Sequence, residues 1–83
     1  MEIQITKSAT RQLDKIPNNL AKRIYFKILE LKNNPTPFGS IKLKGENNHR
    51  IRIGDYRVIY WINYRGDEIV VLRIKHRRDV YKD

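Results

Sequence analysis

The spacing of apolar residues changes from helical to alternating near the middle of the chain, and this change limits the folds that the sequence can adopt. Four apolar residues recur at helical spacing in the first half: Leu20, Ile24, Ile28 and Leu31. From residue 49 to residue 76, apolar residues instead alternate with polar ones, which indicates β-strands. Helices followed by closely spaced strands predict an α+β domain in which the helices cover a sheet.

Two helices are predicted before residue 35. Ser8 occupies the expected N-cap of the first helix. One face of that helix is apolar, with Ala9, Leu13 and Ile16. Pro17 ends it and can start the second helix, because proline is tolerated in a first turn. Asn33-Asn34-Pro35 stops the second helix. The pair forms a helical hairpin whose apolar side must cover another element.

Four strands are predicted around this hairpin. Residues 1–6 alternate as a short strand, and residues 36–48 form a connector interrupted by proline and glycine. Residues 49–53, 56–63 and 68–76 follow as an antiparallel meander with tight turns between them. We therefore predict a single domain over residues 1–83, with a four-stranded sheet that carries both helices on one face. The other face stays open.

The charge balance points to an anionic partner. The sequence has 18 Lys and Arg against 9 Asp and Glu, a formal net charge of +9. The excess is spread over both halves of the chain, so the whole domain is cationic. A field of this sign suits a polyanion or an acidic protein, although a solvated surface that happens to be basic is the competing interpretation.

Several function classes are excluded by composition. Without cysteine the chain forms no disulfides and no thiolate metal sites. Two histidines without a cluster of other ligands do not predict a metal site. No apolar run is long enough to span a membrane, and the N-terminus lacks the apolar core of a signal peptide. We expect a cytoplasmic protein with no membrane partner.

Two arginines in the first strand of the meander share one side. Arg50 and Arg52 alternate with Ile51 and Ile53, so the arginines face solvent if the isoleucines face the helices. A pair of guanidinium groups on an open sheet face can bind phosphate. Ordinary solvent-facing residues would show the same pattern, and both interpretations stay open at this point.

Two stretches of the chain read LKGENNHRIRIGDYRVIY at residues 43–60 and IKHRRDVY at residues 74–81. In this pattern the sequence resembles the RelE family of the RelE/ParE toxin superfamily. The resemblance implies a type II toxin that cleaves messenger RNA on the ribosome, through attack of a 2′-hydroxyl on the adjacent phosphate, without metal or other cofactor. It implies a small sheet that binds RNA on its concave face. It also implies a RelB-like antitoxin that forms a hetero-oligomer with the toxin.

The resemblance suggests roles for individual residues. Arg50 and Arg52 match the paired basic positions of the family, and Arg57 matches the arginine that holds the scissile phosphate. Arg77, or its neighbour Arg78, matches the arginine near the leaving group, and Tyr81 matches the terminal aromatic that stacks on the substrate. The predicted RNA-binding set is completed by Lys42, Lys44, His49 and Arg78.

The implied reaction also needs a group that accepts the 2′ proton. Arginine is not readily deprotonated, so Arg50 and Arg52 are poor general bases. His76 or His49 is the predicted alternative, because imidazole titrates near neutral pH. A hydrogen-bonding role at a strand end is the competing interpretation of His76. Trp61 is predicted to pack in the core.

Two other functions share the predicted fold. A ParE-type inhibitor of DNA gyrase resembles this chain in architecture, so fold alone does not separate the two. A non-catalytic RNA- or protein-binding module is the third candidate, because arginine stands at positions 50 and 52 where the family commonly has lysine. Cleaved messages, DNA damage or salt-dependent binding without product would distinguish the three.

Overall fold

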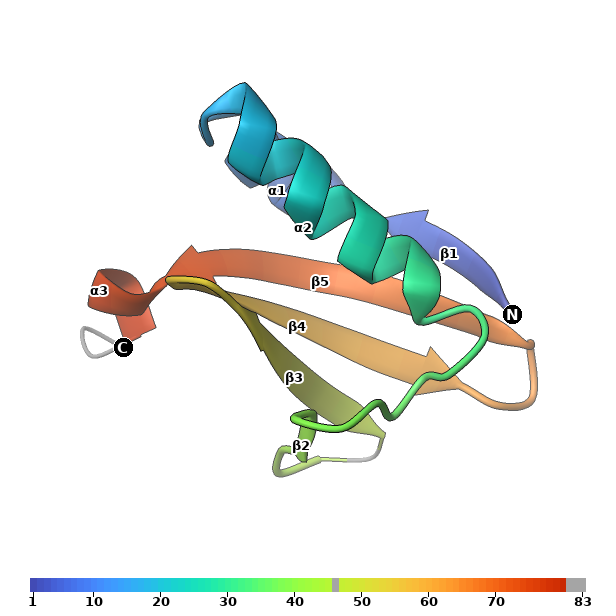
Figure 1. Ribbon diagram of the computed structural model, residues 1–83. Coiled ribbons are helices and arrows are strands. Elements are labelled where there is room, and N and C mark those ends of the chain that lie inside the picture. Colours follow the sequence, from blue (N-terminus) through green and yellow to red (C-terminus); the bar gives the residue numbers. More distant parts are fainter. Residues whose placement is uncertain (46, 81–83) are drawn as a thin grey trace.

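The computed structural model (Figure 1) describes residues 1–45 and 47–80, the last two by their backbone alone. Along the chain, the elements are β1 (Glu2–Ile5), α1 (Lys7–Asp14), α2 (Asn18–Glu30), β2 (Ile41–Lys42), β3 (Asn48–Ile53), β4 (Tyr56–Asn63), β5 (Glu68–His76) and α3 (Arg77–Val80). The helices of the first half are thus followed by strands, as the change in apolar spacing predicts.

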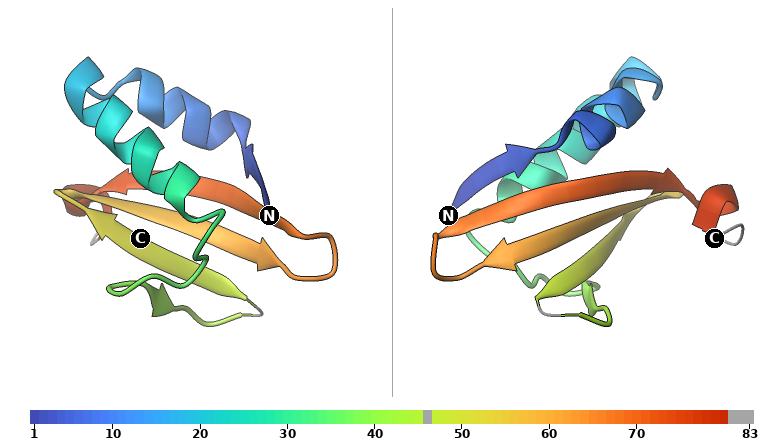
Figure 2. Two further views of the ribbon diagram at one scale, coloured as in Figure 1. Left: turned by 45° about the vertical axis from the view of Figure 1, so that its right-hand side comes forward. Right: turned by 180° about the vertical axis from the view of Figure 1, so that it is seen from behind.

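The strands form one mixed sheet in the order β1-β5-β4-β3-β2. β1 runs parallel to β5, and the other described pairs are antiparallel. Both α1 and α2 lie on one side of the sheet, as the views in Figure 2 show. The predicted architecture is confirmed with one correction. The sheet has five strands rather than four, because Ile41–Lys42 of the predicted connector pairs with β3 at the edge.

The first helix begins earlier than predicted. Thr6, and not Ser8, is the N-cap residue, and its hydroxyl accepts a hydrogen bond from the Ala9 N–H at 3.2 Å. The same hydroxyl donates to the carbonyl of Leu72 in β5 at 3.0 Å. The prediction placed the cap at Ser8 because the contact with β5, which fixes the choice, is far away in sequence.

The second helix follows Pro17, whose φ of −52° already suits a helix start. The carbonyl of Pro17 accepts the first hydrogen bond of the helix, from Ala21 N–H at 2.9 Å. Past Glu30 the chain leaves the helix in a run of tight turns. Among residues 1–45 and 47–80, no helix combines the length and the apolar content needed to cross a membrane.

The core lies between the helical hairpin and one face of the sheet. Its buried side chains come from α1 and α2 and the residues that follow them, and from the meander: Ala9, Ile16, Ile24, Ile28, Leu31, Ile53, Val58, Tyr60, Ile62, Ile69, Val71 and Ile74. From Val58 to Ile62, every second residue of β4 belongs to this set, which is the alternation expected of a strand covered on one side. The residues between them must therefore lie on the opposite face.

Tyr60 is the largest fully buried side chain. Its hydroxyl donates a hydrogen bond of 2.7 Å to the carbonyl of Pro35, which ties the chain after α2 to the middle of the sheet. Burial raises the pKa of Tyr60 above its ordinary value of 10.0. The folded state therefore holds the phenolic proton more tightly than the unfolded chain does.

This tyrosine predicts a loss of stability at high pH. A raised pKa contributes stability that is complete below pH 10.0 and is lost as the pH rises from there toward the folded-state pKa. We expect Tyr60→Phe to cost about 1 kcal/mol at neutral pH, because the hydrogen bond to Pro35 is lost. Above pH 10.0 the difference in the free energy of unfolding between wild type and Tyr60→Phe should become smaller. Urea unfolding at a series of pH values measures this difference. Tyr25→Phe, on an exposed tyrosine, is the control, and parallel pH profiles for wild type and Tyr60→Phe would contradict the argument.

Candidate functional site

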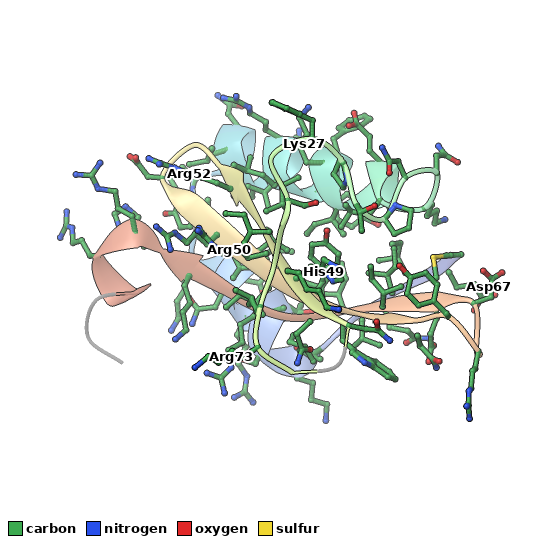
Figure 3. The ribbon with its side chains drawn as sticks, turned by 90° about the horizontal axis from the view of Figure 1, so that it is seen from below. Lys27, His49, Arg50, Arg52, Asp67 and Arg73 are labelled. Carbon is green, nitrogen blue, oxygen red and sulfur yellow. The ribbon has the colours of Figure 1, made fainter. Side chains whose placement is uncertain are left out.

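The face of the sheet turned away from α1 and α2 is strongly basic, and Figure 3 views the molecule from that side. Ile53 of β3 and Val58 of β4 point into the core, so their neighbours in sequence point the other way. Arg50 and Arg52 of β3 lie on this face together, as the alternation predicted. Arg57 of β4 joins them, because it pairs in register with Arg52.

A β-bulge in β5 adds two basic side chains that were not among the predicted site residues. Val71 and Arg73 pair with consecutive residues of β4, so Leu72 between them is an extra residue. Beyond the bulge, Ile74 returns to the core. Arg73 and Lys75 therefore face the same side as the arginines of β3 and β4. A strict alternation from Val71 would have placed them on the helix side.

We call this surface the cationic face and define it by five residues: Arg50, Arg52, Arg57, Arg73 and Lys75. Three neighbouring strands supply them. The acidic residues on this side of the described strands are Glu2 and Glu68, which pair at the opposite end of the sheet. Basic groups gathered in this way repel one another, and binding of a polyanion relieves the repulsion.

Arg57 lies at the centre of the cationic face, between Arg52 and Lys75 in register. Its side chain is partly buried. Its Nε is buried, and within the described residues it has no hydrogen-bond partner. A buried donor without an acceptor costs about 1–3 kcal/mol. Arg57 therefore carries an unsatisfied donor inside the fold, at the centre of the cationic face.

The turn between β3 and β4 collects another arginine. Arg52 donates from its Nε to the carbonyl of Gly54 at 3.1 Å, which leaves its other guanidinium donors for a ligand. Arg77, the first residue of α3, lies across the same turn, with its backbone N–H 2.7 Å from the carbonyl of Asp55. Its guanidinium is 3.8 Å from the Asp55 carboxylate. Arg77 is therefore held at the same end of the sheet as Arg52 and Arg57.

The structure does not bring His49 to the cationic face. His49 is buried on the helix side of β3, and its ring stacks on Tyr60 with 5.7 Å between ring centroids. Its Nδ1 lies 3.1 Å from the carbonyl of Asn47. Alternation explains this placement, since His49 directly precedes Arg50 in the strand. Its contacts are those of a core residue.

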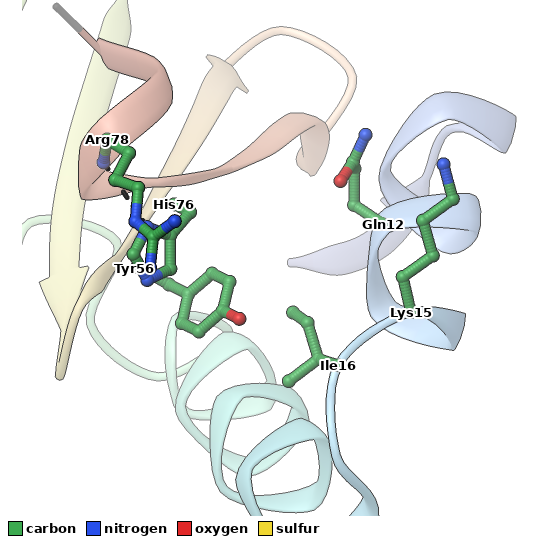
Figure 4. Close-up of a pocket in the computed structure, with 6 residues that line it drawn as sticks. All are labelled: Gln12, Lys15, Ile16, Tyr56, His76 and Arg78. Atoms are coloured by element: carbon green, nitrogen blue, oxygen red, sulfur yellow. Dashed lines mark hydrogen bonds between the residues drawn. The ribbon is translucent and has the colours of Figure 1, made fainter.

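His76 also lies on the helix side. It lines a cleft of about 330 Å³ with Tyr56, Arg78 and three residues at the end of the helical hairpin: Gln12, Lys15 and Ile16 (Figure 4). The His76 ring meets Tyr56 edge-on at 5.0 Å, and its Nδ1 accepts the backbone N–H of Arg78 at 3.2 Å. The bulge in β5 causes this placement, because it reverses which side His76 faces.

The other predicted RNA-binding residues are more scattered. Lys42 of β2 pairs with His49, on the opposite side of the sheet from Arg50, and Lys44 is exposed in the following loop. Tyr81 lies outside the described residues. Among residues 1–45 and 47–80, no group of three His, Asp or Glu side chains is placed to hold a metal ion.

Trp61 was predicted to be a core residue, and this prediction is wrong. It lies between Tyr60 and Ile62, which are both fully buried, and it therefore faces the opposite side of β4. Its register partners there are Asn48 of β3 and Val70 of β5. The side chain is partly exposed, and Trp61 lies near the end of β4 that leads into the turn toward β5.

Comparison with known proteins assigns the chain to a family. Residues 3–81 match the family model described as the ParE toxin of the type II toxin–antitoxin system parDE. Toxin RelE3 of Methanocaldococcus jannaschii is 34% identical, over 98% of this chain and 96% of that toxin. The chain belongs to the RelE family of toxins. The resemblance noted in its basic strand and C-terminal stretch is thereby confirmed.

Other RelE-family proteins extend the likeness over nearly the whole chain. Toxin RelG of Mycobacterium tuberculosis is 30% identical, over 96% of this chain and 94% of that toxin. The structure of an archaeal RelE–RelB complex from Pyrococcus horikoshii superposes with a TM-score of 0.83 at 33% identity. That match covers 92% of this chain and 93% of the other. This RelE-family chain is thus the toxin component of a type II toxin–antitoxin system.

Proposed function

We propose that this toxin is an endoribonuclease that cleaves messenger RNA on the ribosome in the cytoplasm, with the cationic face as its active surface. The observation that carries the proposal is the convergence of five basic side chains from three strands, with Arg57 at their centre. An open surface of this kind suits a single strand of RNA, whose phosphates need cations and whose bases stay unpaired.

The proposed reaction needs three groups from the protein: donors that hold the phosphate, a base that takes the 2′ proton, and a donor to the leaving 5′ oxygen. The 2′-hydroxyl loses its proton and attacks the adjacent phosphorus, the bond from phosphorus to the 5′ oxygen breaks, and the products carry a 2′,3′-cyclic phosphate and a 5′-hydroxyl. Negative charge builds on the phosphate oxygens before that bond breaks. Arg57 and Arg52 hold these oxygens, because a guanidinium can donate two parallel hydrogen bonds to a phosphate.

Lys75 takes the 2′ proton in this proposal. Lys75 pairs in register with Arg57, so the two side chains are neighbours on the cationic face and reach the same part of a bound RNA. A guanidinium stays protonated under ordinary conditions, whereas a lysine can release its proton and act as a base. Neither histidine has such a position, because His49 and His76 lie on the helix side. Arg77 donates to the leaving 5′ oxygen, which takes its proton from water.

We further propose that an antitoxin covers the cationic face and forms a hetero-oligomer with this chain. The Pyrococcus horikoshii relative is a RelE–RelB complex, at 33% identity to this chain. A segment that is disordered when free can wrap a wide surface and become ordered on binding. Acidic side chains in that segment would neutralise the repulsion among Arg50, Arg57 and their neighbours.

Primer extension on a defined message tests the proposed activity. Purified toxin is incubated with the message, with and without ribosomes stalled on it. Cuts that appear only with ribosomes, and that leave cyclic phosphate ends, are the expected result. A folded protein that makes no cuts, in cells that instead accumulate broken DNA, would replace the nuclease by a gyrase inhibitor of the ParE type. Cuts of naked message at the same rate would remove the ribosome from the proposal.

RNA binding by the cationic face predicts a steep dependence on salt. Each phosphate neutralised on a single strand contributes about −0.7 to the slope of log affinity against log salt, so five contacts give about −3.5. Replacing Arg73 with alanine should reduce the magnitude of this slope by about 0.7, measured with an uncleavable 2′-O-methyl RNA. Arg23→Ala removes an equal charge from the exposed side of α2 and serves as the control. Equal slopes for Arg73→Ala and wild type would contradict the assignment.

A further inference from the structure

The cationic face continues past its basic residues to an aromatic side chain that the proposed reaction does not use. Trp61 lies on the same side of β4 as Arg57, four residues further along the strand. At about 3.4 Å per residue the two side chains are roughly 14 Å apart. Between them lies Ile59, flanked in register by Arg50 and Arg73. A strand of RNA held at Arg57 can therefore reach Trp61 within a few nucleotides along a path lined by arginines.

Trp61 lines a recess at this end of the sheet. The recess has a volume of about 450 Å³ and is bounded by Asn47, Trp61, Ile62, Asn63, Tyr64 and Arg65. Its residues lie where β3 begins and where β4 runs into its turn toward β5. Figure 1 shows that these strand ends are at the end of the sheet opposite α3. Its lining combines two aromatic rings with two amides and one guanidinium.

The polar side chains that line the recess differ in whether their hydrogen-bonding atoms already have partners. Both polar atoms of the Asn63 amide are engaged, with Glu68 at 3.1 Å and with the Gly66 N–H at 3.0 Å. Within the described residues, neither the side chain of Asn47 nor the guanidinium of Arg65 makes a hydrogen bond or ion pair. These two groups can therefore meet the polar edge of a ligand whose flat surface lies on an aromatic ring.

We propose that this recess binds an unpaired base of the RNA substrate, stacked on Trp61, a few nucleotides from the scissile phosphate. The proposal rests on the proposed nuclease function and adds a subsite to it. Stacking on aromatic side chains beside a basic track is the usual way in which proteins hold single-stranded RNA. Asn47 and Arg65 contact the edge of the base, so the recess contributes to the choice of sequence at a distance from the cut.

The fluorescence of Trp61 tests the stacking directly, because it is the single tryptophan of the chain. A 2′-O-methyl RNA oligonucleotide long enough to span the cationic face and the recess is titrated into the full-length protein. Stacking of a base on the indole should quench the emission in a saturable manner. An otherwise identical oligonucleotide that lacks its bases should bind through its phosphates, as seen by anisotropy of an end label, and leave the emission unchanged.

Two substitutions separate stacking from simple packing. Trp61→Phe keeps an aromatic ring and should bind the oligonucleotide within a few-fold of wild type. Trp61→Leu keeps apolar volume without a ring and should bind about 5- to 100-fold more weakly, in line with the loss of one stacked base. Tyr25→Ala, an exposed aromatic of α2, is the matched control and should bind as wild type does. Thermal unfolding verifies that each variant is folded.

The outcomes separate this inference from the function on which it rests. If the oligonucleotide binds and the message is cut, but Trp61 emission stays constant and Trp61→Leu binds as well as Trp61→Phe, the base subsite is overturned and the nuclease stands. If emission responds to a purified antitoxin and not to RNA, the recess is a protein-docking site and the proposal fails. Quenching that persists in a protein that cuts no message supports the subsite and removes the catalytic proposal alone.

Discussion

Replacing Arg57 with alanine should lower the rate of message cleavage by about 10²- to 10³-fold, the usual effect of removing one group that stabilises charge in a transition state. The same change should leave the domain as stable as wild type or slightly more stable. Arg57 carries a buried Nε without a partner in the described structure, and it lies among like charges. Its removal relieves both costs. A residue that lowers stability where it stands is better explained by ligand binding than by folding.

Single-turnover cleavage on stalled ribosomes and thermal unfolding measure the two effects together. Arg57→Lys keeps the charge but loses the paired donors of the guanidinium, so its rate should fall between wild type and alanine. Arg23→Ala, which removes a charge from exposed α2, should change neither quantity. If Arg57→Ala unfolds at a clearly lower temperature, or cuts within a few-fold of wild type, Arg57 is a structural residue and the centre of the active surface lies elsewhere.

The helices and the meander were predictable because their signals are local. The apolar spacing that leads from Leu20 to Leu31 reports one helical face, and the predicted strands 56–63 and 68–76 coincide with β4 and β5. Each signal lies within the element that it describes. The alternation of residues 50–53 alone likewise predicts that Arg50 and Arg52 share one face of the sheet, as they do.

The missing parts of the prediction depend on contacts between distant segments. The bulge at Leu72 leaves no mark in the sequence, yet it decides that Arg73 and Lys75 join the cationic face and that His76 leaves it. Thr6 holds the carbonyl of that bulged residue while it caps α1, a contact across 66 positions. Local reasoning favoured Ser8 as the cap because that contact is invisible to it.

Trp61 shows why residue type alone misassigns a side chain. A tryptophan in a strand rich in apolar residues is most often buried, and this reasoning placed Trp61 in the core. The phase of alternation gives the opposite answer, because Tyr60 and Ile62 on either side are fully buried. Where a strand is covered on one side, the position of a residue in the alternation is therefore stronger evidence for its burial than its residue type. The same phase separates His49 from its neighbour Arg50.

These placements give the two ends of the sheet different tasks under the proposed function. The end near α3 gathers Arg52, Arg57 and Arg77 around the reacting phosphate. The end near the β4–β5 turn carries Trp61 and its recess. β4 runs from one end to the other and buries its other side in the core. It therefore fixes the distance between the reacting phosphate at Arg57 and the recess at Trp61. A stiff, central strand is well suited to this, because a small displacement of a reacting group costs much of the rate.

Lys75 provides the sharpest test of the proposed chemistry. Both Lys75→Arg and Lys75→Ala should lower the cleavage rate by about 10²- to 10⁴-fold, the contribution of a positioned general base. The arginine variant should still bind uncleavable RNA within a few-fold of wild type, because the charge opposite Arg57 is retained. A loss of rate without a loss of affinity is the result expected of a proton acceptor and not of a phosphate anchor.

Rescue by free amines distinguishes proton transfer from a structural effect. A small primary amine added to Lys75→Ala can occupy the vacated space and take the 2′ proton, so the rate should rise in proportion to the concentration of its unprotonated form. The same amine should leave Arg57→Ala unchanged, because that variant lacks a phosphate donor and not a base. Wild-type cleavage by Lys75→Arg would show that the proton leaves through another group. The cationic face would then bind and orient the message, with the base supplied from outside Arg50, Arg52, Arg57, Arg73 and Lys75.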